Sequence, residues 1–251
     1  MRGWYVISLR PLNRHGGLRR AAAARGARLF AVSTLALQPL ADDAALARAL
    51  QCSEVVVTSP SAVRMARAAD RLLPNRRGQR WFALGAGSAA ALRRRGIGTV
   101  HVPAAGSDSE ALLALPELRD VHGRRIGLLT APGGRGLIAR ALRARGAQLQ
   151  VAETYRRVPR PPAPARLAAL AALPPRQALV LTSLEAFEPL WRALDDGGKA
   201  RLRAAPCVVA SERLAAHAAA LGFACVLRAA GTRPSQLLDA LAGHATQVRI
   251  R

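Results

Sequence analysis

The chain has 251 residues, of which 51% are apolar and only 4% aromatic, and its formal net charge is +23. This length is enough for two domains with cores of their own, and the apolar content excludes a disordered chain. No apolar run approaches the roughly 20 residues that a membrane span needs. The opening segment, MRGWYVISLRP, is too short and too soon interrupted for a signal peptide.

The predicted elements alternate along the chain: short β-branched runs are separated by Ala-, Leu- and Arg-rich segments of helical period. This is the pattern of βα units around a parallel sheet. The predicted strands are Trp4–Leu9, Leu29–Leu35, Glu54–Thr58, Trp81–Leu84, Thr99–Val102, Arg125–Leu129, Leu149–Tyr155, Ala178–Thr182, Cys207–Ala210 and Cys225–Leu227. The predicted helices are Gly17–Arg25, Ala62–Leu72, Ser88–Arg95, Ser109–Leu115, Gly136–Arg145, Leu184–Leu194, Glu212–Leu221 and Ser235–Leu241. Two sets of five strands predict an α/β fold with two doubly wound, flavodoxin-like parallel sheets.

Much of this pattern occurs twice. The segment Ile7–Thr34 reads against Ile126–Thr154, with Ile7 over Ile126, and the next residue is Leu35 in one copy and Tyr155 in the other. The other matching pairs are Val55–Val63 with Leu179–Phe187, Phe82–Gly96 with Val208–Gly222, and Ser109–Leu113 with Ser235–Asp239. In both copies a glycine ends a helix just before the next strand: Gly26, Gly96, Gly146 and Gly222. Two similar lobes imply a cleft between them, and Tyr155 marks where the copies differ.

Two proline-bearing stretches indicate connectors between the lobes. Leu37–Leu40 follows the second predicted strand, and Arg157–Pro164 follows the matching strand of the second copy. Proline favours extended chain there and resists helix and sheet interiors. The spacing predicts an interleaved arrangement, with residues 1–36 and 159–251 in one lobe, 40–156 in the other, and 37–39 and 157–158 as connectors. A plain division near residue 120 is the simpler alternative, and the spacing leaves it open.

Small polar residues follow several predicted strands and open helices. They are Thr58, Ser59 and Ser61 after one strand, Thr182 and Ser183 at the matching place, and Gly85, Gly87 and Ser88 after another. Ser and Thr cap helices at such positions. The same hydroxyls and free amides also bind carboxylate or phosphate at the C-terminal edge of a parallel sheet. The two interpretations are compatible, and we expect an anion site there.

Several other kinds of site are excluded by spacing. The glycines at 85–87 lack the rest of a dinucleotide fingerprint, and APGGRG at 131–136 lacks the Gly-Lys-Ser/Thr of a P-loop. The five histidines are isolated, so neither a hydrolase triad nor a metal site is predicted. Three cysteines (Cys52, Cys207 and Cys225) lie in or beside apolar runs, as do buried thiols in a reducing cytoplasm. We therefore expect no metal and no cofactor.

The excess of positive charge does not by itself indicate a nucleic-acid partner. Lys199 is the single lysine, so the charge reflects arginine used throughout an Ala-rich chain. These arginines are spread over predicted helices, without interleaved aromatic residues and without a nucleic-acid motif. We expect no nucleic-acid partner, whereas a small polyanionic substrate suits a positive cleft.

The ordered set of short motifs resembles the uroporphyrinogen-III synthase family along essentially the whole chain. It comprises Leu9–Pro11, Thr58–Val63, Ala83–Ala89, Gly106–Leu113, Gly133–Arg135, Leu142–Ala147, Tyr155–Arg157 and Leu181–Ser183. Two positions depart from the family's usual pattern: Ser8 stands where Thr is common, and Thr130 where Arg is common. The resemblance implies two flavodoxin-like lobes joined by a two-stranded connector, in the interleaved order.

The resemblance further implies a cofactor-free enzyme that converts hydroxymethylbilane, a linear tetrapyrrole with eight carboxylates, to uroporphyrinogen III plus water, with ring D inverted. Holding a reactive chain in one bent shape is catalysis by orientation. Tyr155, whose phenol stays protonated at neutral pH, would assist departure of the hydroxyl. We expect the carboxylates to meet the strand-end residues Ser59, Ser61, Gly85, Gly87, Ser88, Thr182 and Ser183, with Arg10 adding charge.

The same resemblance predicts a cytoplasmic monomer without a membrane or nucleic-acid partner, and a transient hand-over of substrate from hydroxymethylbilane synthase is left open. The alternative from another class is a non-catalytic, two-lobed binder of anionic small molecules that closes by hinge motion. Such a binder would leave the difference between Leu35 and Tyr155 unexplained.

Overall fold

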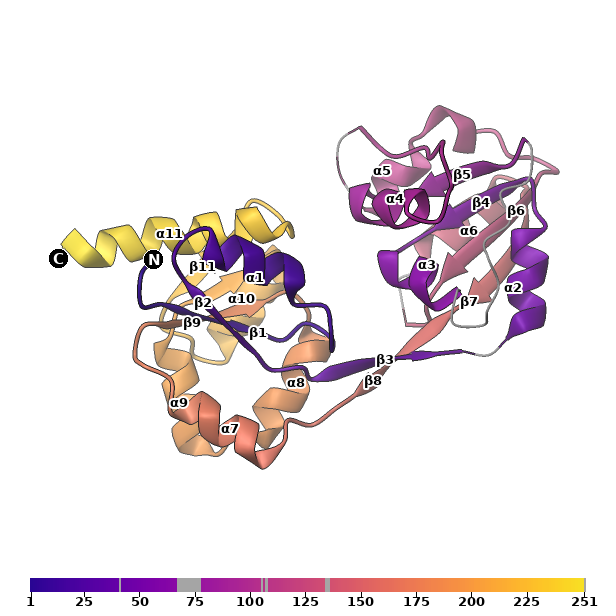
Figure 1. Ribbon diagram of the computed structural model, residues 1–251. Helices are drawn as coiled ribbons and strands as arrows, with labels where there is room; N and C mark the ends of the chain where they lie inside the picture. The colour runs from indigo at the N-terminus through magenta and orange to yellow at the C-terminus, as the bar shows by residue number, and fades with distance from the viewer. Residues whose placement is uncertain (41, 67–77, 105, 107, 134–135, 251) are drawn as a thin grey trace. The chain divides into compact units, whose positions relative to one another are not determined.

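The fold was analysed in a computed structural model, which describes residues 1–40, 42–66, 78–104, 106, 108–133 and 136–250. The chain forms two compact units. Unit 1 comprises Met1–Leu37 and Val158–Arg251, and unit 2 comprises Gln38–Arg157. Both termini therefore belong to unit 1 (Figure 1). No helix within the described ranges combines the length and the apolar character that a bilayer span requires.

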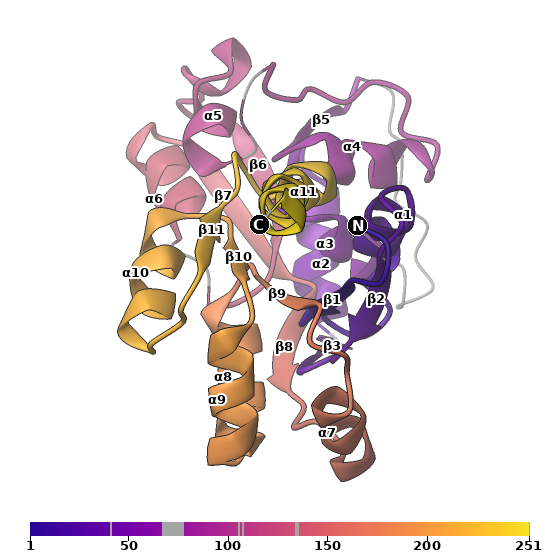
Figure 2. The same ribbon diagram turned by 90° about the vertical axis from the view of Figure 1, so that its left-hand side faces the viewer.

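Unit 1 is built on a five-stranded parallel sheet in the order β11-β10-β9-β1-β2. Its strands are β1 (Tyr5–Ser8), β2 (Arg28–Ala31), β9 (Gln177–Leu181), β10 (Cys207–Val209) and β11 (Val226–Arg228). Its helices are α1 (Gly16–Ala23), α7 (Pro164–Ala171), α8 (Leu184–Ala193), α9 (Asp196–Ala204), α10 (Glu212–Ala220) and α11 (Pro234–Ile250). Both faces of this sheet are covered, as the prediction of a doubly wound sheet requires (Figures 1 and 2).

Alternate residues along each strand supply the two cores of unit 1, because side chains in a strand point to opposite faces in turn. Val6, Ala178 and Val208 pack with Leu18 of α1 and Leu237 of α11. The opposite face carries a separate cluster, which helices α7 to α10 cover: Ile7, Leu179, Val209, Leu170, Phe187, Leu202 and Leu214. The near-continuous apolar strands of the sequence thus reflect burial on both faces.

Unit 2 has a four-stranded parallel sheet in the order β5-β4-β6-β7. Its strands are β4 (Glu54–Val57), β5 (Arg80–Ala83), β6 (Arg125–Thr130) and β7 (Gln148–Glu153). Its helices are α2 (Asp43–Leu50), α3 (Pro60–Ala66), α4 (Ala86–Arg93), α5 (Ser109–Leu113), the 3₁₀ turn η1 (Pro116–Leu118) and α6 (Leu137–Ala144). Leu112, Leu118, Ile126 and Leu142 belong to one core of this unit. The prediction of a mixed α/β fold with parallel sheets is confirmed.

Strands β3 (Leu35–Pro39) and β8 (Tyr155–Pro159) form a separate two-stranded sheet that runs between the two units (Figure 1). The two strands are antiparallel, since Leu40 N–H donates to the Thr154 carbonyl at one end and Arg160 N–H to the Thr34 carbonyl at the other. Pro39 and Pro159 are the last residues of these strands, where a missing N–H is tolerated. The two-stranded connector that the family resemblance implied is therefore present.

Several predicted elements differ from the structure. The single strand predicted at Leu29–Leu35 is interrupted between β2 and β3, and that predicted at Leu149–Tyr155 ends at Glu153 before β8 begins. The strand predicted at Thr99–Val102 is reduced to one parallel bridge between Phe82 and His101. Helix α11 extends to Ile250, well beyond the predicted end. Helices α2, α7 and α9 were not predicted, and residues 67–72 of the predicted helix Ala62–Leu72 lie outside the described residues.

The pairing register corrects the predicted alignment of the first strand of each half. Ile7 pairs with Leu179 and Phe30 in unit 1, and the residue that pairs with Val55 and Gln150 in unit 2 is Gly127. Ile7 therefore corresponds to Gly127, one residue beyond the predicted partner Ile126. A slip of one residue moves a side chain to the other face of a sheet, so the correction changes which residue meets which helix. The internal repeat itself stays a prediction.

Candidate active site

The polar residues predicted to bind anions in unit 2 follow strands whose C-terminal ends lie at one edge of the sheet. Strand β4 pairs with β5 on one side and β6 on the other, all in parallel. Thr58 follows β4, and its hydroxyl donates to the Leu129 carbonyl at 3.3 Å and lies 3.1 Å from the Thr130 hydroxyl. The carboxyl ends of neighbouring strands are thus tied together, as expected for a ligand-binding edge of an α/β sheet.

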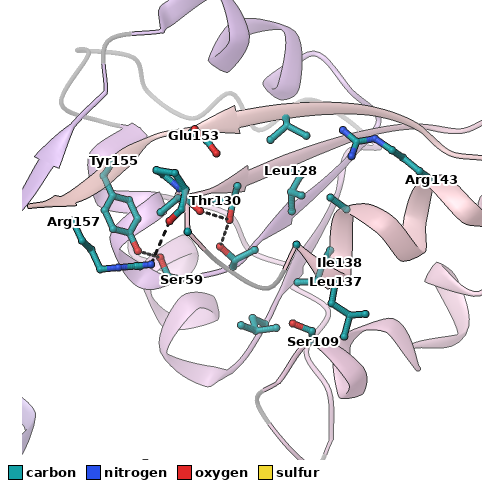
Figure 3. A pocket seen from close by; sticks show the side chains of 18 residues that line it. Ser59, Ser109, Leu128, Thr130, Leu137, Ile138, Arg143, Glu153, Tyr155 and Arg157 are labelled. Carbon is teal, nitrogen blue, oxygen red and sulfur yellow. Dashed lines mark hydrogen bonds between the residues drawn. The ribbon is translucent and has the colours of Figure 1, made fainter. Parts of the chain in front are cut away.

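Tyr155 lies at this edge with its hydroxyl turned toward Ser59, as Figure 3 shows. The Tyr155 and Ser59 oxygens are 3.2 Å apart, and Tyr155 is 6% exposed. Ser59 also caps α3, since its Oγ accepts the N–H of Ala62 at 3.0 Å. With that lone pair occupied, the Ser59 hydroxyl hydrogen can point to the phenol oxygen. Burial and this hydrogen bond fix the phenol in one position.

A pocket of about 460 Å³ opens beside Tyr155 within unit 2. One end of it is polar and carries Ser59, Thr130 and Tyr155, while the other is apolar and carries Leu128 and Ile138 (Figure 3). The pocket is large enough for one or two small heteroaromatic rings, and its lining combines an apolar wall with a few polar groups, as is usual for small-molecule sites.

None of the charged groups of this pocket was predicted from the sequence as a site residue. Arg143 of α6 and Glu153 and Arg157 of β7 and β8 line it. Arg157 donates to the Pro132 carbonyl at 3.3 Å, which holds its side chain across the polar end. A signal was present: Glu153, Tyr155 and Arg157 are spaced by two along extended chain, which places their side chains on one face. Arg143 reaches the pocket through packing of α6, for which no local signal exists.

The other residues predicted in unit 2 lie near the same edge but do not line the pocket. Ser61 accepts a hydrogen bond from Arg64 at 3.2 Å. Gly85 is the extended N-cap of α4, and Ser88 is buried with its N–H donated to the Gly85 carbonyl at 3.0 Å. A methyl group at Gly87 would lie 3.3 Å from the Pro60 ring, so the loops that open α3 and α4 touch. Residues 134–135 of the motif Gly133–Arg135, which carries part of the family resemblance, lie outside the described residues.

The remaining predicted residues, Arg10, Thr182 and Ser183, lie at the C-terminal edge of the sheet of unit 1. Ser183 is the N-cap of α8, but its side chain makes no capping hydrogen bond. It differs in this from Ser59, for which the capping interpretation is confirmed. Burial lowers the pKa of Arg10, whose side chain is largely enclosed just after β1. Arg10 and Ser183 thus lie at the sheet edge of unit 1, whereas Ser59 and Tyr155 lie at the sheet edge of unit 2.

His15 is a buried residue at the edge of unit 1 that sequence spacing treated as isolated. Its Nδ1 lies 2.9 Å from the Ser8 hydroxyl and its Nε2 2.8 Å from the Ser33 hydroxyl, so the ring bridges the ends of β1 and β2. Burial, and then the charges of Arg19, Arg10 and Arg166, together lower the pKa of His15 to about 4. The imidazole is therefore neutral at pH 7, with one nitrogen donating and the other accepting.

The free energy of unfolding is expected to decrease as the pH is lowered, because His15 takes up a proton in the unfolded chain but not in the folded chain. The stabilising difference is complete above the unfolded pKa near 6.5 and is lost as pH falls toward the folded value of about 4. This amounts to about 2 kcal/mol between pH 7 and pH 5. Denaturant unfolding of the wild type and of His15→Gln at both pH values measures it. Subtracting the unfolding free energies of the two proteins at each pH removes the contribution of the carboxylates, which both proteins share. An equal pH dependence of the two free energies would contradict the lowered pKa of His15.

The three cysteines were predicted to be buried thiols. The three thiols are free, Cys52 and Cys207 buried and Cys225 half-buried. Burial, and then the neighbouring Cys225, raises the pKa of Cys207 to about 12, which makes this thiol unreactive. Among the residues that the structure describes, no group of three or more His, Cys, Asp or Glu side chains could hold a metal ion.

Two units built on parallel sheets, and a buried phenol beside a pocket at the edge of one sheet, define the class: a two-unit α/β protein with a small-molecule pocket. The family model described as uroporphyrinogen-III synthase HemD matches residues 17–239. The chain belongs to the uroporphyrinogen-III synthase family. The uroporphyrinogen-III synthase of Salmonella typhimurium is 34% identical over 163 residues, which are 64% of this chain and 66% of that protein. The aligned part is thus slightly less than two thirds of this relative.

Solved structures resemble the whole chain. The uroporphyrinogen-III synthetase of Helicobacter pylori matches with a TM-score of 0.62 at 14% identity, covering 99% of this chain and 100% of that one. A mutant uroporphyrinogen III synthase of Thermus thermophilus matches with a TM-score of 0.57 at 18% identity and the same coverage. At such low identity these likenesses show the fold alone. The fold expected from the family resemblance is therefore confirmed.

Proposed function

We propose that this protein cyclises hydroxymethylbilane to uroporphyrinogen III, with inversion of ring D and loss of water. The observation that carries the proposal is the buried phenol of Tyr155, held 3.2 Å from Ser59 at the polar end of a pocket. The resemblance between the two halves makes this position informative, since Leu35 stands at the matching place in unit 1. Membership of the synthase family supplies the reaction class.

Tyr155 acts as the proton donor of the first step. Its hydroxyl gives a proton to the terminal CH₂–OH of the substrate while the C–O bond breaks and water leaves. The pyrrole nitrogen supplies the electron pair, keeps its N–H and becomes part of the protonated azafulvene, a cation. The phenolate left behind is stabilised by the Ser59 hydroxyl, whose other interaction is with the N–H of Ala62. The proton returns to Tyr155 when the last ring regains aromaticity, so the net products are uroporphyrinogen III and water.

Inversion of ring D requires that ring to attack through its substituted carbon, fragment from the spiro intermediate and close again. No group needs to do more than hold the chain bent, since the electrophile is reactive by itself. The apolar wall of Leu128 and Ile138 suits a pyrrole ring, and Arg143 and Arg157 suit its carboxylate arms. Further arms meet the strand-end residues Ser61, Gly87, Ser88, Thr182 and Ser183 and the guanidinium of Arg10.

We further propose that the protein works in the cytoplasm as a monomer, with no cofactor and no nucleic-acid partner, and with its substrate as its ligand. Since unaided closure destroys the substrate, a transient hand-over from hydroxymethylbilane synthase would be an advantage. The family and the composition support this proposal. Analytical ultracentrifugation at micromolar concentration measures the oligomeric state, and a single species with the mass of one chain is expected.

A coupled assay tests the activity. Hydroxymethylbilane is generated in the reaction mixture, this protein is added, the products are oxidised, and porphyrin isomers I and III are separated by chromatography. Isomer III at catalytic protein concentrations is the expected result. Isomer I alone, from protein with a folded circular dichroism spectrum, would overturn the proposal in favour of a non-catalytic binder of anionic small molecules.

A further inference from the structure

The two stretches of chain that carry Arg10 and the first strands of unit 1 are strongly positive, and the first acidic residue of unit 1 beyond them is Glu185, in the first turn of α8. Residues 1–37 contain seven arginines and neither Asp nor Glu, and residues 158–183 contain no acidic residue either. These two stretches supply β1, β2 and β9 together with the loops that follow them. The arginines of these stretches repel one another in the folded protein, and a bound anion would reduce this repulsion.

Three arginines, Arg10, Arg19 and Arg166, lie close enough to His15 for their charges to lower its pKa. Ser8, which contacts the His15 ring, pairs directly with Ala31 across β1 and β2. Arg166 of α7 donates from Nε to the Ala31 carbonyl at 2.7 Å and lies over the Phe30 ring, 3.7 Å from its centroid. Its side chain is therefore fixed at the end of β2.

Arg10 and Arg19 lie on either side of His15 in the sequence. Arg10 lies two residues beyond Ser8, and its Nε is buried without a hydrogen-bond partner. Arg19 lies one turn along α1, since its N–H donates to the His15 carbonyl at 2.8 Å. Within the described part of the chain, no ion pair is formed by Arg10, Arg19 or Arg166. All three charges act on His15, and the charge of Arg19, after burial, also lowers the pKa of Arg166.

We propose that Arg10, Arg19 and Arg166, held around His15, form a carboxylate site on unit 1 that takes one arm of the linear tetrapyrrole. This rests on the proposed function for the identity of the ligand, while the site itself rests on the geometry. His15 acts as a neutral spacer: it ties the ends of β1 and β2 through Ser8 and Ser33 without adding a fourth cation. Arg19 and Arg166 are positions that the sequence did not single out.

Arg19→Gln is the first test, since Arg19 is exposed on a helix and its removal leaves the fold intact. Arg28→Gln is the matched control: it removes the same charge from the same sheet, but at the start of β2, the opposite edge. We expect Arg19→Gln to raise KM for hydroxymethylbilane about 5- to 10-fold with kcat within about 2-fold of wild type, a normal value for a partly exposed charge-assisted bond. Arg28→Gln should leave KM within about 2-fold. Equal changes of KM in the two variants would mean that only the overall positive charge of unit 1 matters, which would overturn the proposal.

A binding measurement separates this site from the reaction. Citrate, a small tricarboxylate, is titrated into the ¹⁵N-histidine-labelled full chain, and the ring nitrogens of His15 are followed by NMR at constant ionic strength. Saturable shifts of His15 that weaken at least 5-fold in Arg19→Gln and not in Arg28→Gln are expected. Such shifts in a protein that makes only isomer I would keep the carboxylate site and sink the synthase. Isomer III formation without any citrate-dependent shift of His15 would sink the site and keep the synthase.

Discussion

Tyr155→Phe is expected to lower kcat for isomer III about 10- to 100-fold without abolishing it. A positioned general acid is typically worth 10²–10⁴ in rate, and we expect an effect at or below the lower limit because the hydroxymethyl group also leaves unaided. The rest of the barrier is lowered by orientation, which phenylalanine preserves because its ring fills the same buried space. The coupled assay measures this as a slower rate with isomer III still the main product.

Ser59→Ala is the control for this prediction. It removes the partner 3.2 Å from the phenol oxygen but leaves the proton donor in place. A loss smaller than that of Tyr155→Phe is expected, since Ser59 stabilises the phenolate and orients the ring, and a double variant should be little worse than Tyr155→Phe alone. Complete loss of activity in a folded Tyr155→Phe protein would contradict a reaction governed by orientation. Unchanged activity would show that Tyr155 is not the donor.

Much of the fold could be predicted because the strands and helices of βα units have different hydrophobic periods, which are visible in the sequence. The buried strands read as short β-branched runs, and each predicted helix-ending glycine (Gly26, Gly96, Gly146 and Gly222) has a positive φ. The same logic located the site, since loops after parallel strands meet at one edge of a sheet. Ser59 was predicted on these grounds and Tyr155 from the difference between the two copies and from the family resemblance, and a hydrogen bond joins them.

What could not be predicted depends on contacts between distant residues. The break in the predicted strand Leu29–Leu35 coincides with Thr34, whose hydroxyl bonds to the carbonyls of Leu9 and Ala186 rather than to a strand neighbour. His15 is bound by serines 7 and 18 residues away, a separation with no local signature. The short helices α2, α7 and α9 are formed from segments whose apolar stripe is too brief to recognise, so tertiary packing decides them.

Gly127→Ala is expected to have the largest effect on stability, because this glycine lets α2 pack directly against β6. A Cβ at Gly127 would lie 2.8 Å from the carbonyl carbon and 3.1 Å from the Cα of Ala49, and closer still to the Ala49 carbonyl oxygen. These are backbone atoms of a fully buried helical residue, so a side-chain rotation cannot relieve the clash. The cost of such overpacking is about 3 kcal/mol.

The corrected register explains why only one half is sensitive at this position. The corresponding residue of unit 1 is Ile7, a fully buried side chain against the helices α7 to α10. In unit 2 the backbone of α2 at Ala49 occupies the space beside Gly127. Adding one methyl group there displaces either α2 or β6, and β6 leads to Thr130 at the polar end of the pocket.

Hydrogen exchange measured by mass spectrometry checks the prediction for unit 2 separately, which whole-chain unfolding of a two-unit protein does not. We expect amide protection in a peptide covering β6 to fall about 100-fold in Gly127→Ala, the equivalent of about 3 kcal/mol, with the sheet of unit 1 unaffected. Gly98→Ala is the matched control in the same unit, because no atom lies within 4 Å of the added Cβ there. Unchanged protection in Gly127→Ala would mean that α2 shifts without cost. In that case the close packing of Ala49 on β6 does not contribute to holding the strand ends around Tyr155.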